Sequence, residues 1–236
     1  MAKRKSKSWL FKLLLIMAIC LAPGIVLRWV IGQSIAAKMP QLIGPAQSNS
    51  ASVSGSSIDI LQGKIAKVNL HSNKVKLSSG VTVDSLDVGL MGVRFKPDKT
   101  VTEIQSTNFT ASVSEDSLEK YIAASQPDMA NAKVTLSEDK LTISASPRML
   151  ATRTPVTVEG TLRIIDRTKL YLVVNKIRAR GMRVPGFMRG RVMRDINPVL
   201  DTQKLGIGGE FTSVKISCGK IDLTGTADVR QALKSR

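Results

Sequence analysis

The chain has 236 residues, of which 43% are hydrophobic, and this suits one domain with an ordinary core. Its 35 Lys and Arg outnumber 18 Asp and Glu, so the net charge is +17. Such an excess favours an anionic partner, either nucleic acid or membrane head groups. One histidine and two widely separated cysteines exclude a disulfide-rich scaffold and a zinc site built from His and Cys.

The N-terminus carries a membrane-targeting pattern. A lysine-rich start, residues 3–7, precedes a mostly apolar run from Leu10 to Ile31. As a helix, that run would cover ~33 Å, about the thickness of the hydrocarbon layer. We therefore predict a transmembrane signal anchor over residues 1–31, with the N-terminus in the cytoplasm and the domain outside, periplasmic or extracellular. The alternative is a cleaved signal peptide, because residues 34–36 offer small side chains to a signal peptidase.

The rest of the chain divides by composition. Residues 32–57 contain the end of the helix and a serine-rich stretch, which we expect to be a flexible linker. Residues 58–228 form the predicted domain, and residues 229–236 a basic tail.

Alternation of apolar and polar residues dominates the predicted domain and indicates strands with one apolar face. Short turn sequences separate these runs, including residues 138–140, 166–168 and 218–220, so we expect hairpins in a mainly antiparallel sheet. The alternating runs fall within residues 66–70, 86–95, 109–113, 134–136, 141–145, 156–164, 170–174, 214–216 and 221–223.

Two helices interrupt the strands. Ser114 is a suitable N-cap for a helix over Glu115–Ser125, which has acids in its first turn. A second helix is predicted from about Pro185 to Asn197, where Pro198 stops it. This second helix is amphipathic and basic, and it lies in a block, residues 148–194, with twelve Lys or Arg and two acids. A solvated surface is the alternative explanation for that charge.

No catalytic constellation is visible, so the sequence predicts a protein that is not an enzyme and needs no metal or cofactor. It contains no G-x-S-x-G, P-loop or G-x-G-x-x-G motif, and His71 lies on the polar side of a predicted strand. Aromatic residues make up only 4% of the chain, which leaves no stacking platform for single-stranded nucleic acid. We expect a membrane surface as the partner, and no nucleic acid.

Three segments of the predicted domain together carry a family resemblance. The first is residues 63–68 followed by a glycine turn and the strand at 81–88. The second is a strand that enters an acidic helix start, residues 110–118. The third joins the Arg183-Val184-Pro185-Gly186-Phe187 opening of the basic helix to Ile196-Asn197-Pro198-Val199-Leu200 and a final hairpin. In their order and spacing these segments resemble the LmeA-like phospholipid-binding family of bacteria. The resemblance covers roughly residues 58–228; the many arginines and the serine-rich stretch depart from it.

The resemblance implies an α+β fold, in which a strongly curved, mainly antiparallel sheet wraps around a long helix as in tubular lipid-binding proteins. It implies phospholipid binding, no catalysis, and a supporting role in the biogenesis of cell-envelope lipid or glycolipid. If the resemblance holds, the apolar face of the basic helix would line a groove for acyl chains. Its residues are Phe187, Met188, Val192, Met193 and Ile196. Plain core packing is the alternative for this face.

The arginines of the same region would meet the lipid phosphate or dock the domain on an anionic membrane: Arg183, Arg189, Arg191 and Arg194. A second function also fits the sequence. It is a structural or interaction protein with a filled core, which docks on an anionic membrane or a partner through its basic face.

Overall fold

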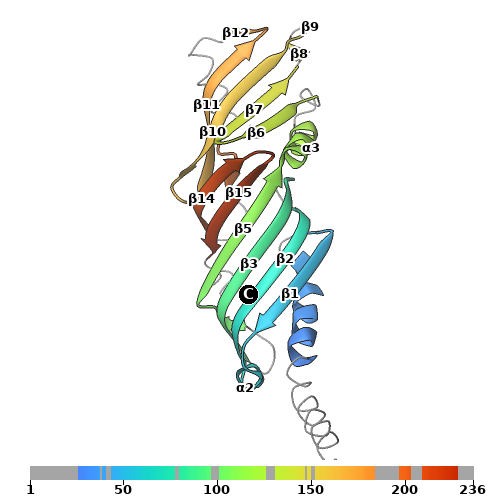
Figure 1. The fold of residues 1–236 in the computed structure, drawn as a ribbon, viewed down its shortest axis with the longest axis vertical. Coiled ribbons are helices and arrows are strands. Elements are labelled where there is room, and N and C mark those ends of the chain that lie inside the picture. Colours follow the sequence, from blue (N-terminus) through green and yellow to red (C-terminus); the bar gives the residue numbers. More distant parts are fainter. Residues whose placement is uncertain are drawn as a thin grey trace, which may run out of the picture.

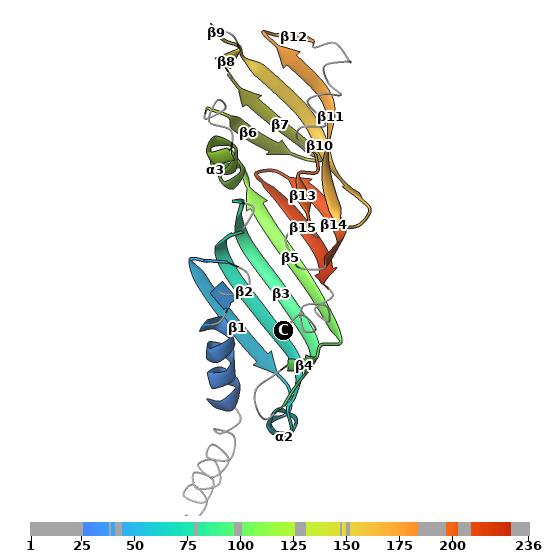
Figure 2. The same ribbon diagram turned by 180° about the vertical axis from the view of Figure 1, so that it is seen from behind.

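Two antiparallel sheets follow one another along the long axis of the molecule (Figures 1 and 2). The computed structural model describes residues 26–37, 39–40, 44–77, 80–96, 101–125, 131–146, 148–149, 152–183, 197–202 and 209–227. The predicted helix over 185–197 therefore lies outside the described residues, apart from Asn197. The mostly antiparallel sheet that the sequence predicts is confirmed, and so is the curling of the sheet that the resemblance implies.

Sheet A has, in spatial order, β1 (Ser48–Ser54), β2 (Lys64–Lys76), β3 (Thr82–Phe95), β5 (Ser106–Ser114), β15 (Lys220–Ala227) and β14 (Gly209–Ser217), with β4 (Val101–Glu103) on β3. Sheet B has β12 (Met182–Arg183), β11 (Lys169–Ala179), β10 (Val156–Ile165), β7 (Lys140–Ala145) and β6 (Lys133–Ser137), with β13 (Leu200–Asp201) on β11. A separate pair is formed by β8 (Arg148–Met149) and β9 (Thr152–Arg153). The predicted alternating runs all fall within these strands, and the turns predicted near residues 138, 166 and 218 connect them.

The serine-rich stretch is not the expected flexible linker, because residues 48–54 form β1 and pair with β2 along their full length. Ala51 and Val53 alternate with the serines, which puts the two apolar side chains on the covered face and leaves Ser50, Ser52 and Ser54 exposed. A low apolar content therefore did not prevent a strand, since an edge strand needs only one apolar face.

Two apolar clusters form the core on one face of sheet A. The larger lies between sheets A and B and includes Ala111, Val134, Leu172 and Leu223. The smaller lies at the opposite end of sheet A and includes Val53, Val68 and Val93. We call the face of sheet A that carries both clusters the inner face, and the opposite one the outer face.

A helix over residues 26–37 covers the smaller cluster, and Leu27, Ile31 and Ile35 pack against it. Its contact with β1 is close, because a Cβ at Gly32 would lie 2.6 Å from the carbonyl oxygen of Ala51. The last residues of the predicted membrane span thus pack on the sheet, while residues 1–25 lie outside the described residues. Among the helices that the structure describes, none combines the length and apolarity that crossing a bilayer requires.

The predicted helix is confirmed as α3 (Glu115–Ser125), and Ser114 caps it by accepting a hydrogen bond from the Ser117 N–H at 3.4 Å. Glu115 and Glu119 accept hydrogen bonds from the backbone N–H groups of Leu136 and Val134 at 2.6 and 2.9 Å. These two carboxylates attach the edge of sheet B to α3.

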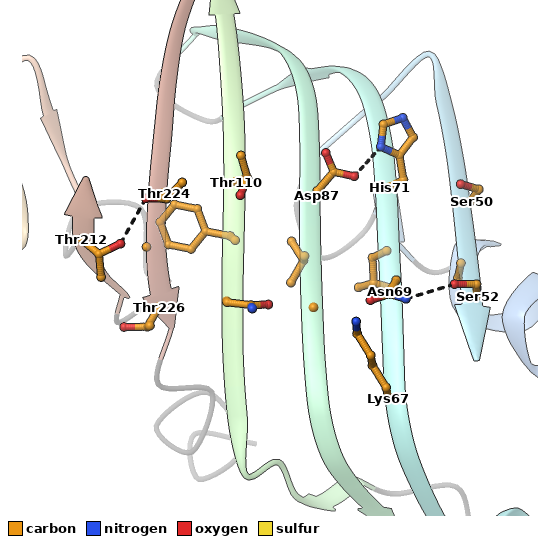
Figure 3. A pocket seen from close by; sticks show the side chains of 17 residues that line it. Ser50, Ser52, Lys67, Asn69, His71, Asp87, Thr110, Thr212, Thr224 and Thr226 are labelled. Atoms are coloured by element: carbon orange, nitrogen blue, oxygen red, sulfur yellow. Dashed lines mark hydrogen bonds and ion pairs between the residues drawn. The ribbon is translucent and has the colours of Figure 1, made fainter. Parts of the chain in front are cut away.

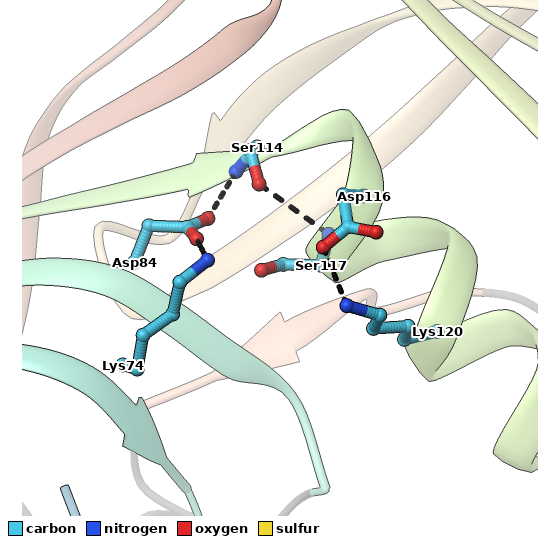
Figure 4. A network of polar contacts seen from close by, with 6 residues as sticks. All are labelled: Lys74, Asp84, Ser114, Asp116, Ser117 and Lys120. Carbon is cyan, nitrogen blue, oxygen red and sulfur yellow. Dashed lines mark hydrogen bonds and ion pairs between the residues drawn. The ribbon is translucent and has the colours of Figure 1, made fainter. Parts of the chain in front are cut away.

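Asp84 ties the β2–β3 hairpin to the start of α3 (Figure 4). Its carboxylate accepts hydrogen bonds from Lys74 Nζ and, at 2.6 Å, from the Ser114 N–H. Partial burial acts to raise the pKa of Asp84, but these bonds and others from Ser114 and Ser117 outweigh it and lower the pKa from 3.8 to about 2. The charged form is thus the one that the fold favours.

We expect Asp84→Asn to lower the free energy of unfolding near neutral pH by about 1–3 kcal/mol, because Lys74 and the Ser114 N–H lose a charged acceptor. Since the folded-state pKa is depressed, this stabilisation is present above about pH 4 and is lost as the pH falls towards 2. Urea unfolding at a series of pH values measures the difference. The exposed turn residue Glu138, changed to Gln, is the control. A gap between wild type and Asp84→Asn that stays constant down to pH 2 would contradict the assignment.

Candidate functional site

The middle of the inner face of sheet A lies between the two apolar clusters. The register places Ala51 opposite Leu70, Leu70 opposite Val88, and Val88 opposite Phe109. These four residues form a row across four strands, which we call the central row, and all four are only half-buried. Val88 belongs to neither cluster. The central row is thus an apolar strip that its surroundings cover only in part.

Phe109 closes the β14 side of the central row. Its ring lies over Gly225 of β15, where a Cβ would come within 2.4 Å of the ring carbon Cζ. It also meets Phe211 edge-to-face, with ring centroids 6.2 Å apart and an interplanar angle of 74°. Glycine at position 225 therefore gives the Phe109 ring its place on the inner face.

Two buried polar side-chain atoms, on β5 and on the helix over 26–37, lack a hydrogen-bond partner among the described residues. Thr107, opposite Leu90 on the inner face, is only 6% exposed, and its Oγ1 has no partner in the described part of the chain. Arg28, on the helix over 26–37, has a buried Nε that likewise has none among the described residues. Leaving such buried groups unpaired costs about 1–3 kcal/mol each, so a ligand that pairs with them gains that energy.

The outer face of sheet A is polar in the same region. An open hollow of about 580 Å³ crosses its strands, lined by hydroxyl, amide, imidazole and carboxylate groups (Figure 3). His71 Nδ1 lies 2.6 Å from Asp87 Oδ1, and the Thr212 and Thr224 hydroxyls lie 3.2 Å apart. The residues of the central row also border this hollow, but most of the side chains that line it are polar, which does not suit an acyl chain. His71 is on the polar side of its strand, as predicted.

The residues that the sequence predicts for the acyl groove lie outside the described residues: Phe187, Met188, Val192, Met193 and Ile196. The same holds for three of the head-group arginines: Arg189, Arg191 and Arg194. Arg183 is in β12, directly opposite Arg178 of β11. Asn197, at the predicted end of the basic helix, bonds through its side-chain amide to both backbone groups of Leu172, at 2.8 and 2.9 Å. The described part of the chain therefore does not test how the predicted site residues are arranged, and their role stays a prediction.

The sequence does not single out the central row, although Val88 and Phe109 belong to alternating runs that it predicts. Alternation identifies the apolar face of a strand, whereas the cover over that face comes from distant segments. For Thr107 the sequence offers one signal. Its position alternates in step with Phe109 and Ala111, which indicates that its hydroxyl lies on the apolar face of the strand.

Comparison with known proteins identifies the family of the chain. The family model of LmeA-like phospholipid-binding proteins matches residues 23–226, which includes the helix over 26–37, β1 and both sheets. No curated protein and no solved structure matches the chain. On the extent of the family match, this chain belongs to the LmeA-like phospholipid-binding family.

Proposed function

We propose that the protein is a membrane-tethered, non-enzymatic phospholipid-binding protein that works outside the cytoplasm and supports the biogenesis of cell-envelope lipid. Membership of a phospholipid-binding family suggests lipid binding. The observation that carries the proposal is the half-buried central row, which offers an acyl chain an apolar strip continuous with two apolar clusters.

The acyl chain lies along the inner face in this proposal. Each methylene group that leaves water contributes about 0.8 kcal/mol, so a chain is held there without specific polar contacts. The Thr107 hydroxyl suits an ester carbonyl, and the Arg28 Nε–H suits a phosphate oxygen, because neither Thr107 Oγ1 nor Arg28 Nε has a hydrogen-bond partner among the described residues.

Exposed apolar side chains at the end of the molecule where the helix over 26–37 lies support membrane tethering. The outward side of the helix over 26–37 exposes Val26, Trp29 and Val30, and Trp29 is 65% exposed. At the same end (Figures 1 and 2), the short helix α2 (Ser57–Leu61) exposes Ile58 and Leu61, at 68% and 77%. Exposed tryptophan and aliphatic side chains beside a basic, apolar leader fit the interfacial layer of a bilayer. The lysines before the apolar run keep the N-terminus in the cytoplasm and so place the domain outside.

Lipid that co-purifies with the full chain is the direct test. We expect mass spectrometry of an organic extract of the purified protein to find phospholipid in a fixed ratio to protein, after removal of lipid carried by detergent micelles. A matched membrane protein purified in the same detergent gives the background. A lipid-free chain whose unfolding temperature does not change on delipidation would overturn the proposal and support a filled-core interaction protein.

Val88→Glu is expected to lower the bound phospholipid several-fold, because a carboxylate in the central row must lose its water when a lipid binds. Thr110→Glu is the matched control, since Thr110 belongs to neither apolar cluster and is exposed on the outer face of β5. Equal lipid content in the Val88 and Thr110 variants, both folded by circular dichroism, would show that the central row is not the site.

Thr107→Val tests the unpaired hydroxyl, since valine keeps the shape of threonine. Without lipid, the variant should be as stable as the wild type or more so, because a buried hydroxyl without a partner is removed. Its affinity for a fluorescent phosphatidylglycerol should fall by about two- to tenfold, the equivalent of one hydrogen bond. Thr224→Val, on the outer face, serves as control. An unchanged affinity would mean that Thr107 does not contact the lipid.

A further inference from the structure

We propose that the open hollow on the outer face of sheet A binds a neutral oligosaccharide. The hollow has a volume of about 580 Å³ and is lined by residues of β1, β2, β3, β5, β15 and β14 (Figure 3). Adjacent strands lie ~4.8 Å apart, so a ligand that crosses all these strands extends over about 24 Å, which is longer than one sugar ring. The sheet itself separates the hollow from the inner face, so this site goes beyond phospholipid binding by the central row.

Two neighbouring rows of mostly polar residues form the hollow, because side chains at opposed positions of paired strands lie side by side. Across β2, β3 and β5, one row is His71–Asp87–Thr110 and the next is Asn69–Gly89–Asn108. Serines of β1 and threonines of β15 extend both rows. The lining thus offers amide, hydroxyl and carboxylate groups at regular spacing over a wide, shallow surface.

Gly89 is the residue of these rows that points to a ligand. A Cβ at this position would come within 2.3 Å of the side-chain oxygen of Asn108, so the Asn108 amide lies where a side chain of residue 89 would be. Glycine inside a strand weakens the strand, and it marks a bulge, a bend or the close approach of a ligand. Pairing with β2 and β5 continues regularly on both sides of Gly89, so no bulge accounts for it. We attribute it to a ligand that approaches the strand beside the Asn108 amide.

The charges that line the hollow favour a neutral ligand, although the whole chain has a net charge of +17. Of the described residues that line it, only Lys67, His71 and Asp87 can carry a charge, and His71 Nδ1 lies 2.6 Å from Asp87 Oδ1. An anion would meet the Asp87 carboxylate, and a cation would meet the Lys67 ammonium. A sugar hydroxyl both donates and accepts hydrogen bonds, which matches a lining that mixes ammonium and amide donors with carboxylate and amide acceptors.

The polar side chains of the hollow are available to a ligand. Lys67, Asn108 and Thr110 are exposed, and within the described part of the chain their side chains form no hydrogen bond. Asn69 Nδ2 donates to Ser52 Oγ at 3.5 Å, which is too long for a strong bond. Sugar hydroxyls would replace the water that these groups bind in the free protein, and each such exchange contributes little net free energy. We therefore expect a dissociation constant of about 1 mM.

Saturation-transfer NMR on the full chain in phosphatidylcholine nanodiscs tests this proposal, because the method detects weak binding. The probes are maltohexaose, mannohexaose and chitohexaose, and empty nanodiscs give the background. We expect at least one of these neutral hexasaccharides to bind with an affinity that does not change with ionic strength. The corresponding monosaccharide should bind several-fold more weakly, because it spans fewer strands. No binding by any of the three hexasaccharides, binding of dextran sulfate alone, or equal affinity for the monosaccharide would overturn the proposal.

Two asparagines of β2 supply a matched pair of variants. Asn69 lies in the hollow and Asn73 lies outside it on the same face, and each donates from Nδ2 to a serine of β1, at 3.5 and 3.0 Å. Asn69→Ala should weaken hexasaccharide binding by about two- to tenfold, the equivalent of one hydrogen bond. Asn73→Ala should leave it unchanged. Equal losses would indicate a general effect on the β1–β2 pair and would refute a site in the hollow.

Gly89→Ala separates a binding role from a structural one. The new methyl group displaces the Asn108 amide and fills the hollow, so hexasaccharide binding should be lost. The unfolding temperature should stay the same or rise, because alanine loses less conformational entropy than glycine when a strand forms. A marked decrease in the unfolding temperature would show that Gly89 serves the fold and would overturn the proposal.

Phospholipid content distinguishes the hollow from the inner-face site. The Gly89→Ala variant should keep its co-purifying phospholipid, because the central row lies on the opposite face of sheet A. Loss of phospholipid together with hexasaccharide binding would refute a separate site. Hexasaccharide binding by a chain without phospholipid would instead refute the inner-face site and support the hollow.

Discussion

The register of β3 between β2 and β5 decides what each face of sheet A presents. In this register Val88 lies between Leu70 and Phe109, while His71, Asp87 and Thr110 form the next row on the opposite face. Because side chains alternate along a strand, a slip by one residue would turn Asp87 or Gly89 to the apolar side and Val88 to water. Both the apolar strip and the polar hollow depend on this one alignment. The hydrogen bonds from Lys74 and Ser114 to Asp84 hold the start of β3 beside the start of α3.

Within the described part of the chain, no single element covers the whole inner face of sheet A. Sheet B covers one end through the larger cluster, and the helix over 26–37 covers the other through the smaller one. The central row remains between them, and neither the buried Thr107 hydroxyl nor the buried Arg28 Nε has a hydrogen-bond partner in the part of the chain that the structure describes. A protein selected only for stability would fill the strip with larger side chains and pair these groups. Incomplete coverage is therefore consistent with a ligand as the missing component.

Local pattern predicted the strands and α3 well, since alternation and the Ser114 cap act over a few residues. The strand β1 was missed because its serines resemble a linker in composition, and its pairing with β2 is a tertiary contact. The site was predicted by helical periodicity and family resemblance over 183–196, and all of it except Arg183 lies outside the described residues. The central row and the hollow on the outer face could not be found from sequence, because both depend on which residues lie across from each other between strands.

The position of the helix over 26–37 also bears on self-association. β1 is the last strand on its side of sheet A, and an edge strand offers unpaired backbone groups to any other chain that can add a strand. The helix lies beside β1 in both views, with Gly32 so close to the Ala51 carbonyl that no side chain fits between them (Figures 1 and 2). It therefore shields this edge, and the same segment that leads from the N-terminus protects the sheet from edge-to-edge aggregation.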